Sequence, residues 1–282
     1  MVRIGALGDV LLTRRLTYSL SLAGFRSTLL APARHALLLL ADPWIEAVLD
    51  SEAPALAPAF EGVWPGQSGA FDLACVISRQ EGLVIAAHQA AAVVVSVSPT
   101  PLREDAPIWA QWAEATSEIT SLFRGALPAL RPKAADAVLS GASLIHPGSG
   151  STAKNWPVEK FLALSRQLQG LGHRVVWIRG PAEVGQPDAW DGERIDRPSL
   201  QTLAAILAVS RIFIGNDSGV SHLAGATGTS LVVLFGPTNP TVWRPDGPRV
   251  QVVRAASGAL EDISVESVVM AADHEPQSPG ST

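Results

Sequence analysis

The stretch RIFIGNDSGVSHLAGATGTSLVVLFGPTNP, residues 211–240, decides the fold class. It opens with a short apolar, β-branched run over Arg211–Ile214, which predicts a strand. Residues Ser218–Thr227 have helical spacing, and a second apolar run follows at Leu231–Phe235. A strand, a crossover helix and a second strand in this order are typical of parallel pairing. We therefore predict an α/β protein with a parallel sheet.

The same alternation extends outward from this stretch in both directions. In the C-terminal half it predicts strands at Ser143–His146, Arg174–Ile178 and Val250–Val253, and helices at Pro157–Gly170, Ser199–Val209 and Val265–Ala272. In the N-terminal half it predicts strands at Val2–Ile4, Ser27–Ala31, Leu73–Ile77 and Val93–Val97, and helices at Asp9–Ala23 and over most of Ala106–Phe123. The run Val93-Val94-Val95 favours an interior strand that is covered on both faces.

The two halves are separated by a segment typical of a linker. Residues Gly125–Lys133 include Gly125, Pro128 and Pro132. We predict an N-terminal αβα domain over residues 1–133, a C-terminal αβα domain over 134–272 with a cleft between the two, and a frayed tail over 273–282. Only Met1–Ile4 precede the first turn, which is short for a parallel strand. Either the natural start lies upstream or this strand is curtailed.

Composition excludes several classes of protein. The 282 residues are 47% hydrophobic and carry a net charge of −5, which does not fit a disordered chain or a basic nucleic-acid binder. The single cysteine, Cys75, cannot form an internal disulfide, and no stretch predicts a signal peptide or a membrane span. We expect a soluble cytoplasmic protein.

The first candidate site is the turn Gly5-Ala6-Leu7-Gly8-Asp9, between the first strand and the first helix. Small residues permit a tight turn and the close approach of a ligand. Asp9 stands where a helix N-cap is expected, which alone explains an aspartate. It also stands at the carboxyl edge of a parallel sheet, where open α/β folds bind ligands. The two roles are compatible.

The second candidate is the loop His146–Pro157, HPGSGSTAKNWP. Glycines, the hydroxyls of Ser149 and Ser151, and the charge of Lys154 suit a phosphate group. The loop is not a Walker A motif, and a plain flexible loop would also be rich in glycine and serine.

The third candidate is Gly215–His222, GNDSGVSH, where another strand ends and a helix begins. Asp217 or Ser218 can cap that helix, and Gly219 leaves room for a ligand at its first turn. We expect His222 to contact the ligand. The turn Phe235–Pro240 ends the next strand and faces the same sheet edge.

Rival patterns are missing from the sequence. There is no G-x-S-x-G elbow, no G-x-G-x-x-G at a strand–helix junction and no Asp-x-Asp pair. Trp109 and Trp112 are three residues apart, which favours a packed helix face.

Four strings in this order resemble glycosyltransferase family 9, the heptosyltransferases of the lipopolysaccharide inner core. They are LGDVLLT at Leu7–Thr13, HPGSGSTAKNWPVEKF at His146–Phe161, FIGNDSGVSHLAGATG at Phe213–Gly228 and LFGPTNPTVWRP at Leu234–Pro245. The resemblance implies a GT-B fold: two Rossmann-like domains, with the donor bound mainly by the C-terminal one and the acceptor facing the N-terminal one.

The resemblance also implies roles for individual residues. Asp9 matches the general base that deprotonates the acceptor hydroxyl. Lys154 matches the lysine that neutralises the donor diphosphate, with Ser149 and Ser151 as neighbouring hydroxyls. The segment that contacts the diphosphate and the sugar is matched by Asp217, Ser218, Gly219 and His222. Glu183 falls near the position of a ribose-binding glutamate.

The expected activity is the transfer of a heptose or related sugar from a nucleoside-diphosphate sugar, first of all ADP-heptose, to a saccharide acceptor. The acceptor is the lipopolysaccharide core or a similar saccharide, and the reaction is expected to be inverting and independent of metal. No cofactor is expected, because the nucleotide sugar is a substrate. Peripheral contact with the inner membrane is compatible with this activity, and nucleic acid is not an expected partner. The alternatives are a catalytically silent nucleotide-sugar-binding module, a family member that uses another sugar nucleotide and glycan acceptor, and an epimerase.

Overall fold

The computed structural model describes residues 1–132, 137–180 and 192–273. The chain divides into two compact units, Met1–Gly125 and Ala126–Thr282. The division falls at the start of the segment 125–133 that the sequence predicts as a linker.

The C-terminal unit is built on six parallel strands in the order β10-β9-β8-β5-β6-β7. The strands are β5 (Ser143–His146), β6 (Val175–Arg179), β7 (Glu193–Asp196), β8 (Ile212–Asn216), β9 (Leu231–Phe235) and β10 (Val250–Arg254). The helices are α7 (Val158–Gly170), α8 (Leu200–Val209), α9 (Gly219–Thr227), α10 (Pro240–Trp243) and α11 (Val265–Asp273), with short 3₁₀ turns at Ala137–Leu139, Thr152–Lys154 and Leu260–Asp262.

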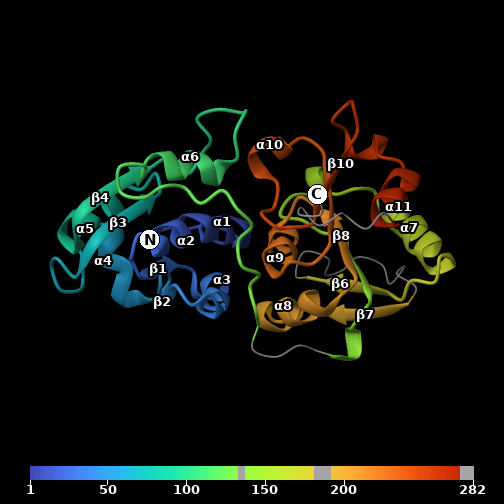
Figure 1. The fold of residues 1–282 in the computed structure, drawn as a ribbon, viewed down its shortest axis with the longest axis horizontal. Helices are drawn as coiled ribbons and strands as arrows, with labels where there is room; N and C mark the ends of the chain where they lie inside the picture. Colours follow the sequence, from blue (N-terminus) through green and yellow to red (C-terminus); the bar gives the residue numbers. More distant parts are fainter. Residues whose placement is uncertain (133–136, 181–191, 274–282) are drawn as a thin grey trace. The chain divides into compact units, whose positions relative to one another are not determined.

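Helices cover both faces of this sheet. Helices α7 and α11 pack together over one face, and α8 packs beside α9 (Figure 1). Every residue of the central strands β5, β8 and β9 is buried, as expected for a parallel sheet covered on both sides. The apolar runs found in the sequence are therefore the interior strands of this unit.

The N-terminal unit contains two parallel pairs, β1 (Ser27–Ala31) with β2 (Ile45–Asp50) and β3 (Phe71–Ile77) with β4 (Ala91–Val97). Val2 bridges Leu30 of β1 and Val76 of β3, so it joins the pairs into one arrangement. The helices are α1 (Leu7–Leu12), α2 (Arg14–Leu22), α3 (Ala33–Ala36), α4 (Ala57–Phe60), α5 (Glu81–Ala90) and α6 (Ile108–Glu114), with 3₁₀ turns at Leu37–Ala41 and Pro54–Leu56.

Two expectations for the first segment of the chain are wrong. Val2–Ile4 does not form a strand: Val2 alone makes β-bridges, to Leu30 and to Val76, and the chain bends at Gly5. The helix predicted over Asp9–Ala23 is two helices that meet at Thr13. The Thr13 hydroxyl donates to the Val10 carbonyl at 2.7 Å, a local bond that disturbs helix continuity.

Two more expectations fail at the edge of the N-terminal unit. Strand β4 pairs only with β3 among the described residues, and Val93 is 49% exposed, so this run is an edge strand and not an interior one. The helical segment predicted over most of Ala106–Phe123 is shortened to α6. The helix ends at Glu114, and in the turn that follows the Thr116 hydroxyl donates to the Ala113 carbonyl.

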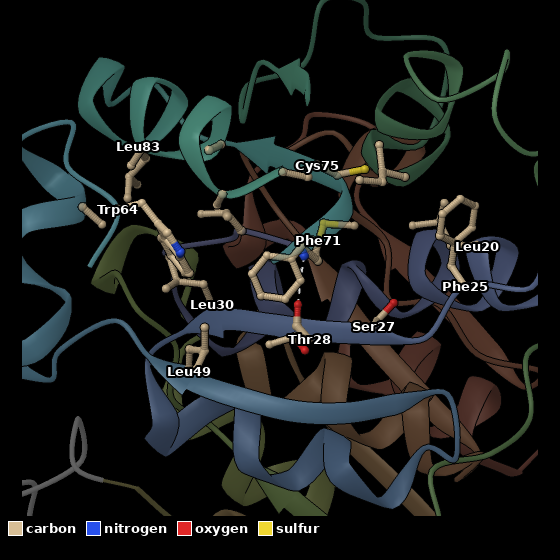
Figure 2. A pocket seen from close by; sticks show the side chains of 18 of the residues that line it. Leu20, Phe25, Ser27, Thr28, Leu30, Leu49, Trp64, Phe71, Cys75 and Leu83 are labelled. Atoms are coloured by element: carbon tan, nitrogen blue, oxygen red, sulfur yellow. Dashed lines mark hydrogen bonds between the residues drawn. The ribbon is translucent and has the colours of Figure 1, made fainter. Parts of the chain in front are cut away.

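An apolar cavity of about 80 Å³ lies in the N-terminal unit, at the edge where β1 and β3 begin (Figure 2). Side chains such as Leu30, Trp64 and Leu83 line it, and the Met1 amino group donates to the Thr28 carbonyl at 2.9 Å on its wall. Cys75 also lines it, and burial raises the pKa of this thiol. None of the predicted site residues that the structure describes lines this cavity.

Within the part of the chain that the structure describes, no helix combines the length and the apolar character needed to cross a membrane.

Candidate functional site

Three loops of the C-terminal unit leave neighbouring parallel strands at the same sheet edge. One follows β5 and contains Lys154, one follows β8 and contains Asp217, and one follows β9 and contains Thr238. Since β9, β8 and β5 are adjacent and parallel, their carboxyl ends bring these loops together. The shared edge predicted from the sequence is present.

Asp217 is the centre of the polar contacts between these loops. Its Oδ2 accepts from the Lys154 ammonium at 3.0 Å and from the Thr238 hydroxyl at 2.8 Å. The Asp217 side chain is buried, whereas that of Lys154 is one-third exposed. The cluster therefore holds a lysine ammonium that is partly open to solvent at the end of the sheet.

Asn216 fixes the loop that carries Lys154. Its side-chain amide donates to the Pro147 carbonyl at 2.6 Å, and its Oδ1 accepts from the Trp156 amide at 3.0 Å. Both ends of the loop are thus tied to the end of β8, which holds the 3₁₀ turn Thr152–Lys154 near Asp217.

Ser149 contributes to the loop itself. Its hydroxyl lies 2.7 Å from both the Ser151 carbonyl and the Asn155 side-chain oxygen. Ser151 is exposed on the same loop. The predicted contact of both hydroxyls with a ligand stays a prediction.

Helix α9 begins at Gly219, two residues after Asp217. Ser218 is its N-cap and accepts from the Ser221 amide, so of the two caps left open by the sequence the serine is the one used. Gly219 is the first helical residue, and His222 lies one turn further and is buried. The partial positive charge of the helix start therefore lies next to Asp217 in the sequence, and at the same sheet edge as the loop that carries Lys154.

Asp9 belongs to the N-terminal unit and is not the N-cap of its helix. Ala6 is the N-cap of α1, and Asp9 is the third helical residue. Its Oδ2 accepts from the Ala6 amide at 3.0 Å, and its Oδ1 accepts from Arg3 Nη2 at 2.6 Å. Its side chain is 28% exposed, so part of the carboxylate faces solvent.

Gly5 permits this position of the Asp9 carboxylate. A Cβ at Gly5 would lie 2.7 Å from Asp9 Oδ2, closer than real Cβ contacts allow. The His35 ring lies 3.1 Å from the Gly5 carbonyl, and burial lowers the pKa of His35 below its usual range. His35 therefore supports the turn that carries Asp9.

The structure adds residues that the sequence analysis missed. Thr238, Asn216 and Asn155 build the lysine loop, and Arg3 and His35 build the aspartate turn. Asn155, Asn216 and Thr238 lie within the loops that the sequence singles out, without a role of their own, whereas no pattern pointed to Arg3 or His35. Glu183 lies outside the described residues.

The described residues hold no group of three or more His, Cys, Asp and Glu side chains placed to bind a metal ion.

Comparison with solved structures defines the fold of the chain. A glycosyltransferase family 9 protein from Veillonella parvula superposes with a TM-score of 0.78 at 20% identity, covering 96% of this chain and 95% of that one. Escherichia coli heptosyltransferase WaaC with ADP superposes with a TM-score of 0.73 at 17% identity, covering 95% and 97%. The predicted α/β class is confirmed, and the fold is GT-B.

The family follows from the sequence itself. Residues 126–271 match the model of glycosyltransferase family 9 (heptosyltransferase), so the chain belongs to this family. Lipopolysaccharide heptosyltransferase 2 of Salmonella typhimurium is 30% identical over 118 residues. That match covers 38% of this chain and only 34% of the relative, about a third of its length.

Proposed function

We propose that this protein is an inverting, metal-independent glycosyltransferase that moves a heptose from ADP-heptose to a saccharide acceptor of the lipopolysaccharide core. Family membership supports the class of reaction. The observation that carries the proposal is the Lys154–Asp217–Thr238 cluster at the carboxyl edge of β5, β8 and β9.

The C-terminal unit binds the donor in this proposal. The Lys154 ammonium and the amides at the start of α9 supply positive charge for a diphosphate, while Asp217 keeps the ammonium in place. The relative WaaC has been solved with ADP and with ADP-2-deoxy-2-fluoro heptose, which supports ADP-heptose as the donor. Ser149, Ser151, Ser218, Gly219 and His222 complete the proposed donor contacts.

Asp9 is the general base in this proposal. Its partly exposed carboxylate accepts the proton of the acceptor hydroxyl while that oxygen bonds to the anomeric carbon of the sugar. The bond from this carbon to the diphosphate oxygen breaks, and its electron pair leaves with the nucleoside diphosphate. A single displacement of this kind inverts the configuration of the anomeric carbon.

The charge that develops on the leaving diphosphate is stabilised by Lys154 and by the start of α9. These groups supply the electrostatic role that a divalent cation has in other transferases. A cytoplasmic location, with peripheral contact at the inner membrane where a lipid-linked acceptor is presented, belongs to the same proposal.

Calorimetric titration without metal tests the donor site. We expect ADP to bind more tightly than GDP, UDP or dTDP, and Lys154→Ala to weaken ADP binding about 10- to 100-fold, the effect of a lost charged hydrogen bond. Lys160→Ala is a matched control, because Lys160 donates to the Ile263 carbonyl instead of to Asp217.

The possible outcomes separate the alternatives. ADP binding without sugar transfer to any acceptor would indicate a silent binding module. Tighter binding of another nucleotide would indicate a different donor. Binding of no nucleotide, or ADP binding that Lys154→Ala leaves unchanged, would contradict the proposed site.

A further inference from the structure

Arg3 connects the buried interior of the N-terminal unit to the Asp9 carboxylate. It is only 7% exposed, and its Nη2 donates to Asp9 Oδ1 at 2.6 Å. The guanidinium carbon lies 5.3 Å from the centre of the Trp112 ring, within the range of a cation–π contact. Trp112 is fully buried and donates to the Ser98 carbonyl, so the ring beneath Arg3 is itself fixed.

The two oxygens of Asp9 have separate partners. Arg3 holds Oδ1, and the Ala6 amide holds Oδ2. The Cα of Gly5 lies beside the same carboxylate, where a Cβ would collide with it. These contacts leave the side chain one orientation, with part of the carboxylate still facing solvent.

The Arg3 guanidinium is poorly explained as a stabilising group alone. Its Nε is buried and has no hydrogen-bond partner among the described residues. A buried donor without a partner is unfavourable, and an apolar side chain on Trp112 would avoid that cost. The hydrogen bond from the guanidinium to Asp9 Oδ1 explains why an arginine, and not an apolar residue, stands at position 3.

Arg14 and Asp42 provide an internal comparison. Arg14 also pairs with an aspartate and also lies near a tryptophan ring, that of Trp44 at 5.9 Å. Both side chains of this pair are fully buried, and both Asp42 oxygens accept from Arg14. Asp42 therefore has no oxygen open to a substrate, and this pair is structural.

We infer that Arg3, held against Trp112, is a positioning residue that fixes the Asp9 carboxylate in the orientation that accepts the acceptor proton. The inference rests on the proposed function, because it takes Asp9 as the base. A base must lie within hydrogen-bond reach of the proton it removes, and small misplacements slow a reaction strongly.

Steady-state kinetics test the inference on three variants, Arg3→Ala, Arg3→Lys and Arg14→Ala. Each variant is measured alone and in combination with Asp9→Asn. We expect Arg3→Ala to lower kcat about 10- to 100-fold. The KM for the donor and the affinity for ADP should stay unchanged, because the donor contacts belong to the C-terminal unit. Arg3→Lys should retain part of kcat, since an ammonium keeps the charge but loses the planar geometry.

Chemical rescue and double variants distinguish positioning from stability. Millimolar guanidinium, far below denaturing concentrations, should restore part of the activity of Arg3→Ala but none in the presence of Asp9→Asn. In the Asp9→Asn background, Arg3→Ala should lower kcat no further. Arg14→Ala should lower thermal stability while the folded enzyme keeps its kcat. If Arg3→Ala does not fold, the same comparison with and without Asp9→Asn is made with Arg3→Lys.

Two results would overturn the inference: full kcat in both Arg3 variants, or equal losses from Arg3→Ala with and without Asp9→Asn. Failure of the proposed function gives a different result, since Asp9→Asn would then turn over like the wild type whatever the Arg3 variants do.

Discussion

Asp217 and Asp9 are both paired with a cation, but they leave different amounts of carboxylate open to a substrate. Asp217 is buried and accepts two hydrogen bonds on one oxygen, from Lys154 and Thr238. Asp9 accepts one bond on each oxygen and is 28% exposed. Because of this difference we propose that Asp217 holds the lysine and that Asp9 takes part in proton transfer.

His173 gives a prediction at the residue scale that concerns stability. It lies 2.8 Å from the Ser143 hydroxyl at the start of β5, and burial, followed by the charge of Arg211, lowers its pKa below 6.5, with Asp273 opposing the shift. The unfolded chain therefore takes up the proton first as the pH falls. Stability from this group is complete above pH 6.5 and is lost as the pH falls from there toward the pKa of the folded state.

Urea unfolding at about pH 7.5 and about pH 5.5 measures this effect. We expect the wild type to lose more free energy of unfolding between the two values than His173→Gln does. An equal loss in both proteins would show that His173 does not contribute to the acid sensitivity.

At the scale of elements, the interior strands of the C-terminal unit and the edge strands β4 and β10 could be predicted from the sequence, whereas the edge strands β2 and β7 could not. Ser143–His146 and Leu231–Phe235 have the predicted bounds, and both strands are buried along their whole length around an apolar centre. Edge strands β2 and β7 were not predicted. The β7 sequence ERID is mostly polar and exposed, so it carries no apolar signal.

For the candidate site too, some residues could be predicted from the sequence and others could not. Strand–helix junctions are visible as glycine and polar residues after an apolar run, which points to Lys154, Asp217 and Asp9. The turn that carries Thr238 was placed at the same edge, but the contacts of Thr238 with Asp217 and of Arg3 with Asp9 depend on side-chain positions that no pattern of the sequence contains.

Helix α9, which starts at the candidate donor site, gives a prediction at the element scale. Its Gly225 packs against the loop before β10, and a Cβ there would lie 2.8 Å from the Asp246 carbonyl oxygen. We expect Gly225→Ala to destabilise the protein by about 1–3 kcal/mol, the usual effect of overpacking.

Gly170→Ala is the control for this substitution. Gly170 is also helical, at the end of α7, and a Cβ there would meet no atom within 4 Å. Alanine favours a helix over glycine, so Gly170→Ala should be neutral or stabilising by about 0.5–1 kcal/mol. Urea unfolding compares the two, and a neutral Gly225→Ala would contradict the close packing of α9.

At the scale of the whole molecule, both units are α/β, but their candidate sites contain different polar residues. The C-terminal unit places a lysine and a helix start at the edge of a complete six-stranded sheet. The N-terminal unit places one aspartate in a tightly held turn. The family model matches residues 126–271, which carry the proposed donor contacts, whereas Asp9 of the proposed acceptor side lies outside this match.

Turnover of Asp9→Asn tests the central claim most directly. The measurement is heptose transfer from ADP-heptose to a lipopolysaccharide-core acceptor in the presence of EDTA, beside calorimetric binding of ADP to the same protein. We predict metal-independent transfer by the wild type, and a kcat about 10²- to 10⁴-fold lower in Asp9→Asn with ADP affinity unchanged. Near-wild-type turnover by Asp9→Asn, or no transfer by the wild type, would contradict the account.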